Sequence, residues 1–309
     1  MINTFLSLAP VFALIALGHG LRRWSLVPAK LWLYAEKLGY YVLMPALIVH
    51  QLSGAKLKEL NVGAMAAVLV GGVLAMSLLV IALRPWLCRL GQVDGPGFTS
   101  IYQGATRSNF FISLVAIGAG FGTDGTVRAI IGFALMPPLM NVLSVLVLAR
   151  YAGDKPASGR RIVEILARNP FLYSAAIGLT LNLTGIGQPP IAGPILAILS
   201  KGALPLTLLC VGSSLDFSRM RSAGRAVILA IVLKLLVLPL LVFLGCLALD
   251  MDSLNTAVAV IFHTTPAAAA SYVMARQMGG DYVLMASILT LQTAVAAVWL
   301  PLTLLLFLR

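Results

Sequence analysis

The chain has 309 residues, of which 60% are hydrophobic and only 10% are charged. Soluble domains carry about 25% charged residues, so this composition excludes a soluble globular protein. The net charge of +12 comes from basic residues scattered between apolar runs, which is typical of membrane topology signals and argues against nucleic-acid binding. The sequence therefore predicts an all-α integral membrane protein in contact with the lipid bilayer.

Apolar segments of about twenty residues recur along the whole chain, the length that a helix needs to cross the hydrocarbon core, and this excludes a β-barrel. Ten spans are predicted, at residues 3–21, 31–52, 62–83, 98–121, 127–149, 169–186, 191–215, 225–249, 254–278 and 283–308. No basic residue precedes the first segment, and Arg22 and Arg23 follow it. We therefore expect a retained helix rather than a cleaved signal peptide.

The distribution of lysine and arginine predicts the orientation. With both ends of the chain outside, the inner connections hold fourteen of the 22 basic residues, the outer connections four, and the spans the remaining four. Cytoplasmic connections carry the excess of positive charge, so both termini are predicted on the non-cytoplasmic side of the inner membrane. Within the spans, Lys37 is expected to reach toward the interface, and Lys201 and Lys234 either to do the same or to face a lumen.

The chain divides into two halves of five spans, residues 1–149 and 169–309, joined by a polar linker at 150–168. The second half of this linker is predicted to form an amphipathic turn at the inner surface. An odd number of spans in each half gives the two halves opposite orientations. Weak similarities support a duplication, because Pro45 and Pro205 are 160 positions apart, and the alignment that places Asn109 opposite Pro266 has a shift of 157. Inverted repeats of this kind are typical of secondary transporters.

Polar residues within the spans mark the candidate site. The fourth span is the most polar, and the ninth contains a proline, which removes a backbone donor and interrupts a helix. Two broken helices from inverted repeats would bring half-helix ends together near the midplane, where their partial positive charge favours an anion. The residues predicted to form this substrate site are Arg107, Ser108, Asn109, His263, Thr265 and Pro266.

Several roles stay open at this point. Pro266 could instead kink a packed helix, and Asn141 and Gln292 could either reach the crossing or form ordinary interhelical hydrogen bonds. His263 could couple protons to transport, and Arg107 could supply or screen charge. No span carries a central pair of carboxylates, which argues against a cation antiporter. Nucleotide-binding and hydrolase signatures are missing and the three cysteines have no metal-site spacing, so no enzyme, metal or other cofactor is predicted.

Sequence segments across nearly the whole chain resemble the auxin efflux carrier family, which includes plant auxin carriers and bacterial malonate transporters. The resemblance is carried by LGYYVLMPALIVHQLS in the second span, LPLTLLCVGSSL in the seventh and TTPAAAASYVMARQMGGD in the ninth. It implies ten helices in two inverted five-helix repeats, with helices 4 and 9 broken and crossed. Helices 1, 2, 6 and 7 would form a scaffold, and helices 3–5 and 8–10 a transport core that moves like an elevator.

The family's site residues are matched here by Asn109, Asn141 and Pro266. Family members usually have a proline shortly after the fourth-span asparagine, and residues 113–116 contain none. The first crossing is therefore expected either to be less unwound or to be unwound by Ser108, Asn109 and Ser113.

The function implied is transport of a small organic anion, such as malonate or an auxin-like acid. Two alternatives remain: a sodium-coupled symporter of the bile-acid type, and a membrane receptor or scaffold without transport activity. Protons and sodium are both candidates for a coupling ion. Gly71 and Gly72 would permit the close helix packing of a homodimer.

Overall fold

The computed structural model describes residues 2–54, 63–152, 170–215 and 224–308, and this part of the chain is helical, without a β-strand. Five of its helical stretches are long and apolar enough to cross a membrane: Gly63–Ala82, Gly95–Tyr151, Ala192–Ser214, Arg225–Ala248 and Tyr282–Phe307. The predicted all-α class with several possible spans is confirmed. The amphipathic turn expected in the linker lies outside the described residues.

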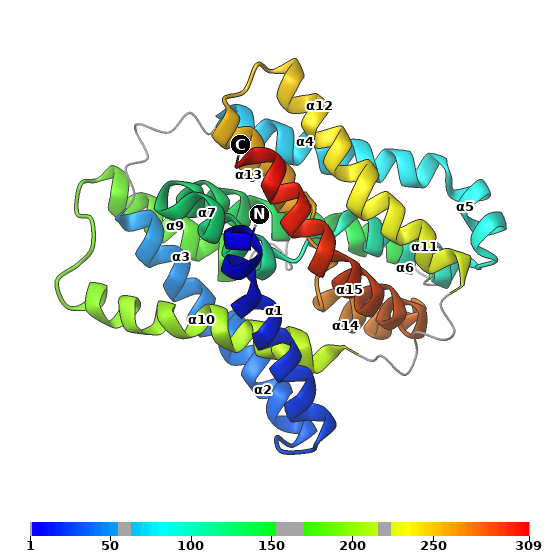
Figure 1. Cartoon of the computed structure of the whole chain (residues 1–309), viewed down its shortest axis with the longest axis horizontal. Helices are drawn as coiled ribbons and strands as arrows, with labels where there is room; N and C mark the ends of the chain where they lie inside the picture. The colour runs from blue at the N-terminus through cyan, green and yellow to red at the C-terminus, as the bar shows by residue number, and fades with distance from the viewer. Residues whose placement is uncertain (1, 55–62, 153–169, 216–223, 309) are drawn as a thin grey trace.

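A first group of helices packs together on one side of the molecule (Figure 1). It consists of α1 (Ile2–Arg23), α2 (Ala29–Leu38), the π-helical segment η1 (Gly39–Leu43), α3 (Met44–Ser53), α9 (Pro170–Leu183) and α10 (Ala192–Ser214). Within this group α10 packs against α1 and α3, and α3 also packs against α9.

Helices α1 and α10 approach each other backbone to backbone. A Cβ atom on Gly18 would overlap the backbone of Leu209, and one on Gly212 would overlap the backbone of Ile15. Small residues permit this kind of close packing between membrane helices. Glycine is therefore required at both positions.

The second group contains the remaining helices. It consists of α4 (Gly63–Ala82), α5 (Arg84–Gly91), α6 (Gly95–Thr106), α7 (Phe110–Tyr151), α11 (Arg225–Val232), the π-helical segment η4 (Leu233–Val237), α12 (Leu238–Ala248), α13 (Ser253–His263), α14 (Ala270–Gln277) and α15 (Tyr282–Phe307). Helices α4 and α12 lie side by side (Figure 1), and Gly72 faces Val242 across this contact, whereas Gly71 has open space beside it.

Two predicted spans are interrupted, and one long helix turns sharply between two predicted spans. Span 98–121 is interrupted at residues 107–109, and span 254–278 at residues 264–269. The long helix α7 contains a sharp turn at Gly122, where φ is 60° and ψ is −147°. Only glycine adopts this backbone conformation readily, so Gly122 separates residues 110–121 from residues 123–151.

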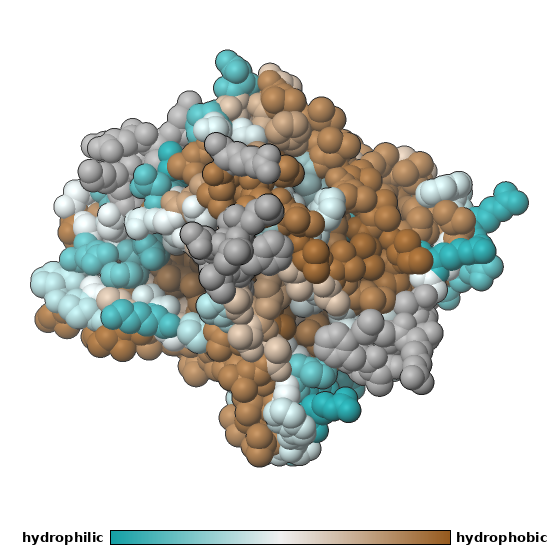
Figure 2. All heavy atoms as spheres, in the orientation of Figure 1, coloured by the Kyte–Doolittle hydropathy of each residue, from teal (hydrophilic) through white to brown (hydrophobic). Residues whose placement is uncertain are grey.

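The surface shown in Figure 2 is apolar over α12 and the neighbouring helices, and hydrophilic at the end where α5 lies. Large exposed side chains of these helices include Leu240, Leu244 and Leu247 of α12 and Leu306 of α15. A broad apolar surface of this kind suits contact with lipid.

Candidate functional site

The two helix breaks contact each other directly in the second group. The backbone N–H of Asn109 donates a hydrogen bond to the carbonyl of Pro266 at 2.7 Å. Beside this contact, the hydroxyl oxygens of Ser113 and Thr265 are 3.0 Å apart. Asn109 and Pro266, which the repeat alignment placed opposite each other, are thus neighbours in space, and Thr265 lies beside them.

The first break forms without a proline. Arg107 has extended backbone angles (φ −82°, ψ 131°), and the side chain of Asn109 caps α7 by accepting a hydrogen bond from the Ile112 N–H at 3.2 Å. Ser113 supports the turn, because its hydroxyl lies 2.9 Å from the Asn109 carbonyl oxygen. An asparagine cap satisfies a backbone donor that the interrupted helix would leave unpaired. The first break covers residues 107–109 and is shorter than the second at 264–269, and Asn109 and Ser113 stabilise it with their side chains in place of a proline.

The second break follows the end of α13. Thr264 is the C-terminal cap of α13, and its hydroxyl donates to the Val260 carbonyl at 2.8 Å. Pro266 cannot donate a backbone hydrogen bond, and the N–H of the next residue, Ala267, donates to the side-chain oxygen of Gln292 at 2.9 Å. The break is thus stabilised by side chains rather than by helical hydrogen bonds.

Gln292 of α15 connects both breaks and is fully buried. Its amide oxygen accepts from the Ala267 N–H, and its amide nitrogen donates to the carbonyls of Gly104 and Ala230, each at 3.0 Å. Gly104 precedes the first break, and Ala230 precedes η4. Gln292 therefore forms interhelical hydrogen bonds, and one of them reaches the second break at Ala267.

Arg107 forms a buried cluster with residues of α7 and α14. Its guanidinium donates to the Asn141 Oδ1 atom at 2.9 Å and to the Ser144 hydroxyl at 3.3 Å, and it lies 3.6 Å from the sulfur of Met274. The guanidinium also interacts electrostatically with Tyr40 of η1, in the first group. No carboxylate forms an ion pair with Arg107 in the described part of the chain.

Polar atoms without partners occur on Arg107 itself, on the preceding helix α6 and on α14. Within the described residues, the Nε atom of Arg107, both amide atoms of Gln103 and the hydroxyl of Ser271 have no hydrogen-bond partner, and all are buried. Gln103 is one helical turn before Arg107 on α6, and Ser271 is one turn before Met274 on α14. Buried polar atoms are normally paired, so these atoms have unused capacity to bind a polar ligand.

Ser108 belongs to a different cluster from Arg107. Its hydroxyl oxygen accepts a hydrogen bond from the Lys234 amine at 2.6 Å and lies 3.1 Å from the Nδ1 atom of His263. Neighbouring residues in an extended backbone point to opposite sides, which separates this cluster from that of Arg107.

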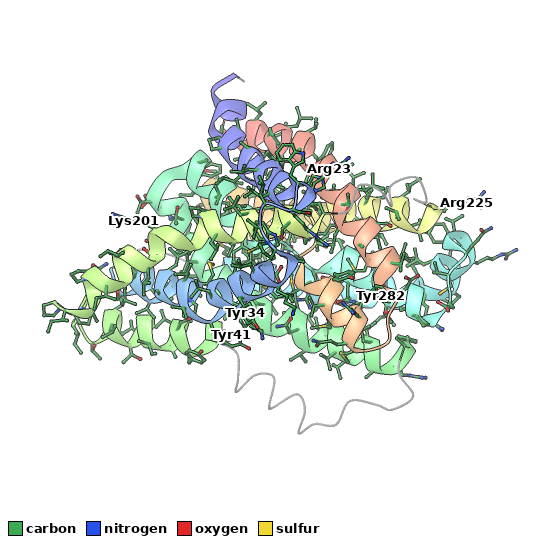
Figure 3. All side chains as sticks on the ribbon, turned by 90° about the horizontal axis from the view of Figure 1, so that it is seen from below. Arg23, Tyr34, Tyr41, Lys201, Arg225 and Tyr282 are labelled. Carbon is green, nitrogen blue, oxygen red and sulfur yellow. The ribbon has the colours of Figure 1, made fainter. Side chains whose placement is uncertain are left out.

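The prediction for Lys234 was wrong. Its side chain is fully buried in η4 and neither reaches an interface nor faces a lumen, because Ser108 offers it an acceptor inside the protein. The sequence signal was a lysine in the middle of the eighth span, but its partner is 126 positions away. By contrast, Lys201 is exposed on α10 (Figure 3) and Lys37 is exposed on α2.

Metal ligands do not gather in the described residues, where no group of three or more histidine, cysteine or acidic side chains could hold an ion.

Comparisons with known proteins bear on this arrangement. A family profile described as membrane transport protein matches residues 159–304. The chain is also 30% identical over 217 residues to a protein of Methanothermobacter thermautotrophicus described as an uncharacterized transporter, and the alignment covers 70% of each chain.

Proposed function

Because the chain belongs to the auxin efflux carrier family of membrane transport proteins, we propose that it is a secondary carrier for a small organic anion, such as malonate or an auxin-like acid, in the inner membrane. The observation that carries this proposal is the buried guanidinium of Arg107 beside the two helix breaks. Its partners in the described residues are neutral, and a buried positive charge without a carboxylate favours a negatively charged ligand.

The proposed binding site lies next to the first break. Arg107 would pair with a substrate carboxylate, because a guanidinium binds this group with two parallel hydrogen bonds. Asn141 holds the guanidinium in place, and the start of α7 adds the partial positive charge of a helix N-terminus. Gln103 and Ser271 offer further hydrogen bonds, because their side-chain polar atoms have no partner among the described residues.

Ten spans in two inverted repeats are part of the proposal. The spans would be α1, α2–α3, α4–α5, α6 with the first part of α7, the rest of α7, α9, α10, α11–α12, α13–α14 and α15. The caps of the two broken helices support the repeat. Asp94 accepts from the Gly97 N–H at the start of α6, and Asp252 from the Asn255 N–H at the start of α13, each at 2.9 Å. These aspartates are separated by nearly the same number of residues as Asn109 and Pro266.

An elevator movement would carry the second group past the first group. The helices of each group pack mainly among themselves, which supports two bodies that slide past each other. Arg107 binds Asn141 of α7, and α7 packs against α1, α3, α9 and α10 of the first group, which supports a site at the boundary of the two groups. A substrate bound there would move with the core relative to the scaffold.

The proposed orientation places both termini outside. The end of α5 lies beside the start of α11, because a Cβ atom on Gly91 would contact Ala226, and the Asp281 N–H donates to the Pro96 carbonyl. Helix α5 and the start of α11, which carry Arg84, Arg89 and Arg225, therefore lie at one end of the second group, which supports a common cytoplasmic face there (Figure 1).

The test is exchange of radiolabelled malonate and other small carboxylates by the full-length protein in proteoliposomes. Arg107→Gln should reduce exchange by tenfold or more, on the order of the loss expected when a charged hydrogen bond is removed. Arg128→Gln is the control, because Arg128 also donates to an asparagine oxygen, but that asparagine, Asn255, is at the start of α13, whereas the second break follows the end of this helix. If the wild-type protein exchanges none of these anions, the receptor or scaffold alternative is favoured instead.

A further inference from the structure

Three side chains from separate elements form one buried hydrogen-bonded chain, which we call the Lys–Ser–His cluster. Lys234 comes from η4, Ser108 from the first break, and His263 from the end of α13. The Ser108 oxygen is 2.6 Å from the Lys234 amine and 3.1 Å from the His263 Nδ1 atom, and all three residues are 0% exposed. Two ionisable nitrogens thus share one hydroxyl.

The surroundings of this cluster contain no carboxylate among the described residues that would fix a positive charge on it. The charged or titratable groups on the elements packed against η4 and α13 and on the adjoining break are Tyr102, Arg107, Asp124, Arg128, Arg150, Tyr151, Arg225, Cys246, His263 and Tyr282. The one carboxylate among them, Asp124, is exposed. The hydroxyl of Tyr102 is engaged with Ser77 of α4, 2.9 Å away. A buried ammonium without an anionic partner is strongly unfavourable, so the cluster holds a proton most readily when a negative charge arrives nearby.

The hydrogen-bond geometry allows one proton to occupy either end. When Lys234 is protonated, its ammonium donates to the Ser108 oxygen, and the Ser108 O–H donates to the Nδ1 atom of a neutral His263. When the proton moves, Nδ1–H of a protonated His263 donates to Ser108, and the Ser108 O–H donates to the neutral Lys234 amine. Each state has the same atoms and the same total charge, and the serine transfers the proton by giving up one hydrogen and receiving another.

The other nitrogen of the imidazole provides a point of access. The Nε2 atom of His263 is buried and has no hydrogen-bond partner in the described parts of the chain. With Nδ1 as acceptor, Nε2 carries a hydrogen, and an unpaired buried N–H is costly. A water molecule or substrate oxygen that reached this atom would be favoured there and would connect the cluster to the transport path.

We propose that the Lys–Ser–His cluster is the proton-binding site that couples this carrier to the proton gradient. This inference rests on the proposed transport function. The cluster takes up one proton from the open side when the anion binds beside Arg107, and it releases the proton on the opposite side when the anion leaves. The anion site and the proton-binding cluster are linked through the backbone, because Ser108 follows Arg107 in the same extended segment.

The first experiment counts protons without a transport assay. Malonate is titrated calorimetrically into the purified full-length protein, in pairs of buffers with different ionisation enthalpies, at several pH values between 6 and 8. Wild-type protein should take up protons on binding, rising toward about one per malonate as the pH is raised, because binding then stabilises the protonated cluster. A count near zero at every pH would overturn the proposal.

The matched variants are Lys234→Arg and Lys201→Arg. Arginine keeps the positive charge and the donor to Ser108 but does not release its proton, so Lys234→Arg should bind malonate with no proton uptake. Lys201→Arg makes the same change at an exposed lysine of α10 and should behave as wild type. Undiminished proton uptake in Lys234→Arg would move the site away from Lys234 and overturn the proposal.

A transport experiment separates coupling from substrate movement. In proteoliposomes with the membrane potential clamped, wild-type protein should accumulate malonate under an imposed pH gradient and should also exchange malonate at equal pH. Lys234→Arg should retain exchange but accumulate at least tenfold less malonate. With a permanent charge in the cluster, the carrier changes its orientation across the membrane only when malonate is bound, so exchange continues but net uptake stops. If wild-type protein exchanges malonate but does not accumulate it under the pH gradient, the inference fails and the proposed function stands. If it neither binds nor exchanges any carboxylate, the proposed function fails first.

If Lys234→Arg does not fold, His263→Gln provides the second variant. Glutamine can keep a hydrogen bond to Ser108 but does not take up a proton, so proton uptake should fall while malonate binding persists. Retention of the full wild-type proton count in this variant would remove His263 from the relay.

Discussion

Arg107 and Ser108 are adjacent in the chain, yet their side chains belong to two separate buried clusters. Arg107 donates to Asn141 of α7, whereas Ser108 accepts from Lys234 of η4. This separation requires the extended backbone of the first break, because consecutive side chains of a helix project about 100° apart rather than to opposite sides. Any movement of the break therefore moves the proposed anion site and the Lys–Ser–His cluster together.

Asn109 is expected to have both a structural and a functional role. Asn109→Ala removes the cap of α7 and should lower the free energy of unfolding by about 0.5–2 kcal/mol. Asn109→Ser restores a capping oxygen but not the amide. If the amide contributes to substrate binding, malonate exchange should be low in both variants. The midpoint temperature of unfolding in detergent should be lowered only in the alanine variant. Normal exchange in Asn109→Ser would restrict the residue to capping.

Pro266 is expected to keep the second break open. Pro266→Ala introduces a backbone N–H and removes the constraint on φ, which favours helix in residues 264–269. Exchange should slow by about tenfold, equivalent to about 1.4 kcal/mol in activation free energy. Pro301→Ala is the control, because Pro301 is also buried but lies within the continuous helix α15. Equal exchange rates in the two variants would favour a simple packing role for Pro266.

Gln292 should be among the most sensitive buried positions. Gln292→Leu leaves the Ala267 N–H and the Gly104 and Ala230 carbonyls without this side-chain partner. Each buried group left unsatisfied costs about 1–3 kcal/mol, so a large decrease in thermal stability is expected. Thr293→Val, one residue further along α15, should have little effect, because Thr293 only donates to the Leu289 carbonyl of its own helix. Similar stability of both variants would contradict the bridging role of Gln292.

Gly122 should not tolerate a side chain, although there is open space beside it. Its φ of 60° and ψ of −147° are strained for alanine, and such a conformation costs about 1–3 kcal/mol. Gly122→Ala should therefore lower the midpoint of thermal unfolding. Gly71→Ala, which also has open space but lies in the regular helix α4, should be neutral or stabilising. An unchanged midpoint for Gly122→Ala would show that the turn relaxes without cost.

Sodium is not expected to support transport. At the breaks, the Ser108 oxygen already accepts from the Lys234 amine, and the permanent positive charge of the nearby Arg107 guanidinium disfavours a bound cation. Replacement of sodium by choline on both sides of the proteoliposome membrane should leave the initial rate of malonate exchange unchanged. A rate that depends on sodium would favour the symporter of the bile-acid type.

The residue pattern of the sequence predicted the two helix breaks at the candidate site. Proline in the ninth span and the polar run in the fourth span indicated two interruptions, and the offset between the halves paired Asn109 with Pro266, which are in contact. These signals can be read from the sequence, because each lies within one short segment or is repeated in the two halves of the chain. The absence of a proline near Asn109 left the first break undecided, because capping depends on where the side-chain oxygen lies.

The sequence by itself determined that this protein is helical and lies in a membrane, because long apolar runs with few charges are stable in lipid only when each segment satisfies its own backbone hydrogen bonds. Family membership was also visible in the sequence. Only the tertiary structure decided which partners the buried polar groups have: Asn141 for Arg107, Ser108 for Lys234, and backbone groups of three helices for Gln292. These contacts join residues far apart in the chain, and their energies depend on distance and burial, which hydrophobic periodicity does not encode.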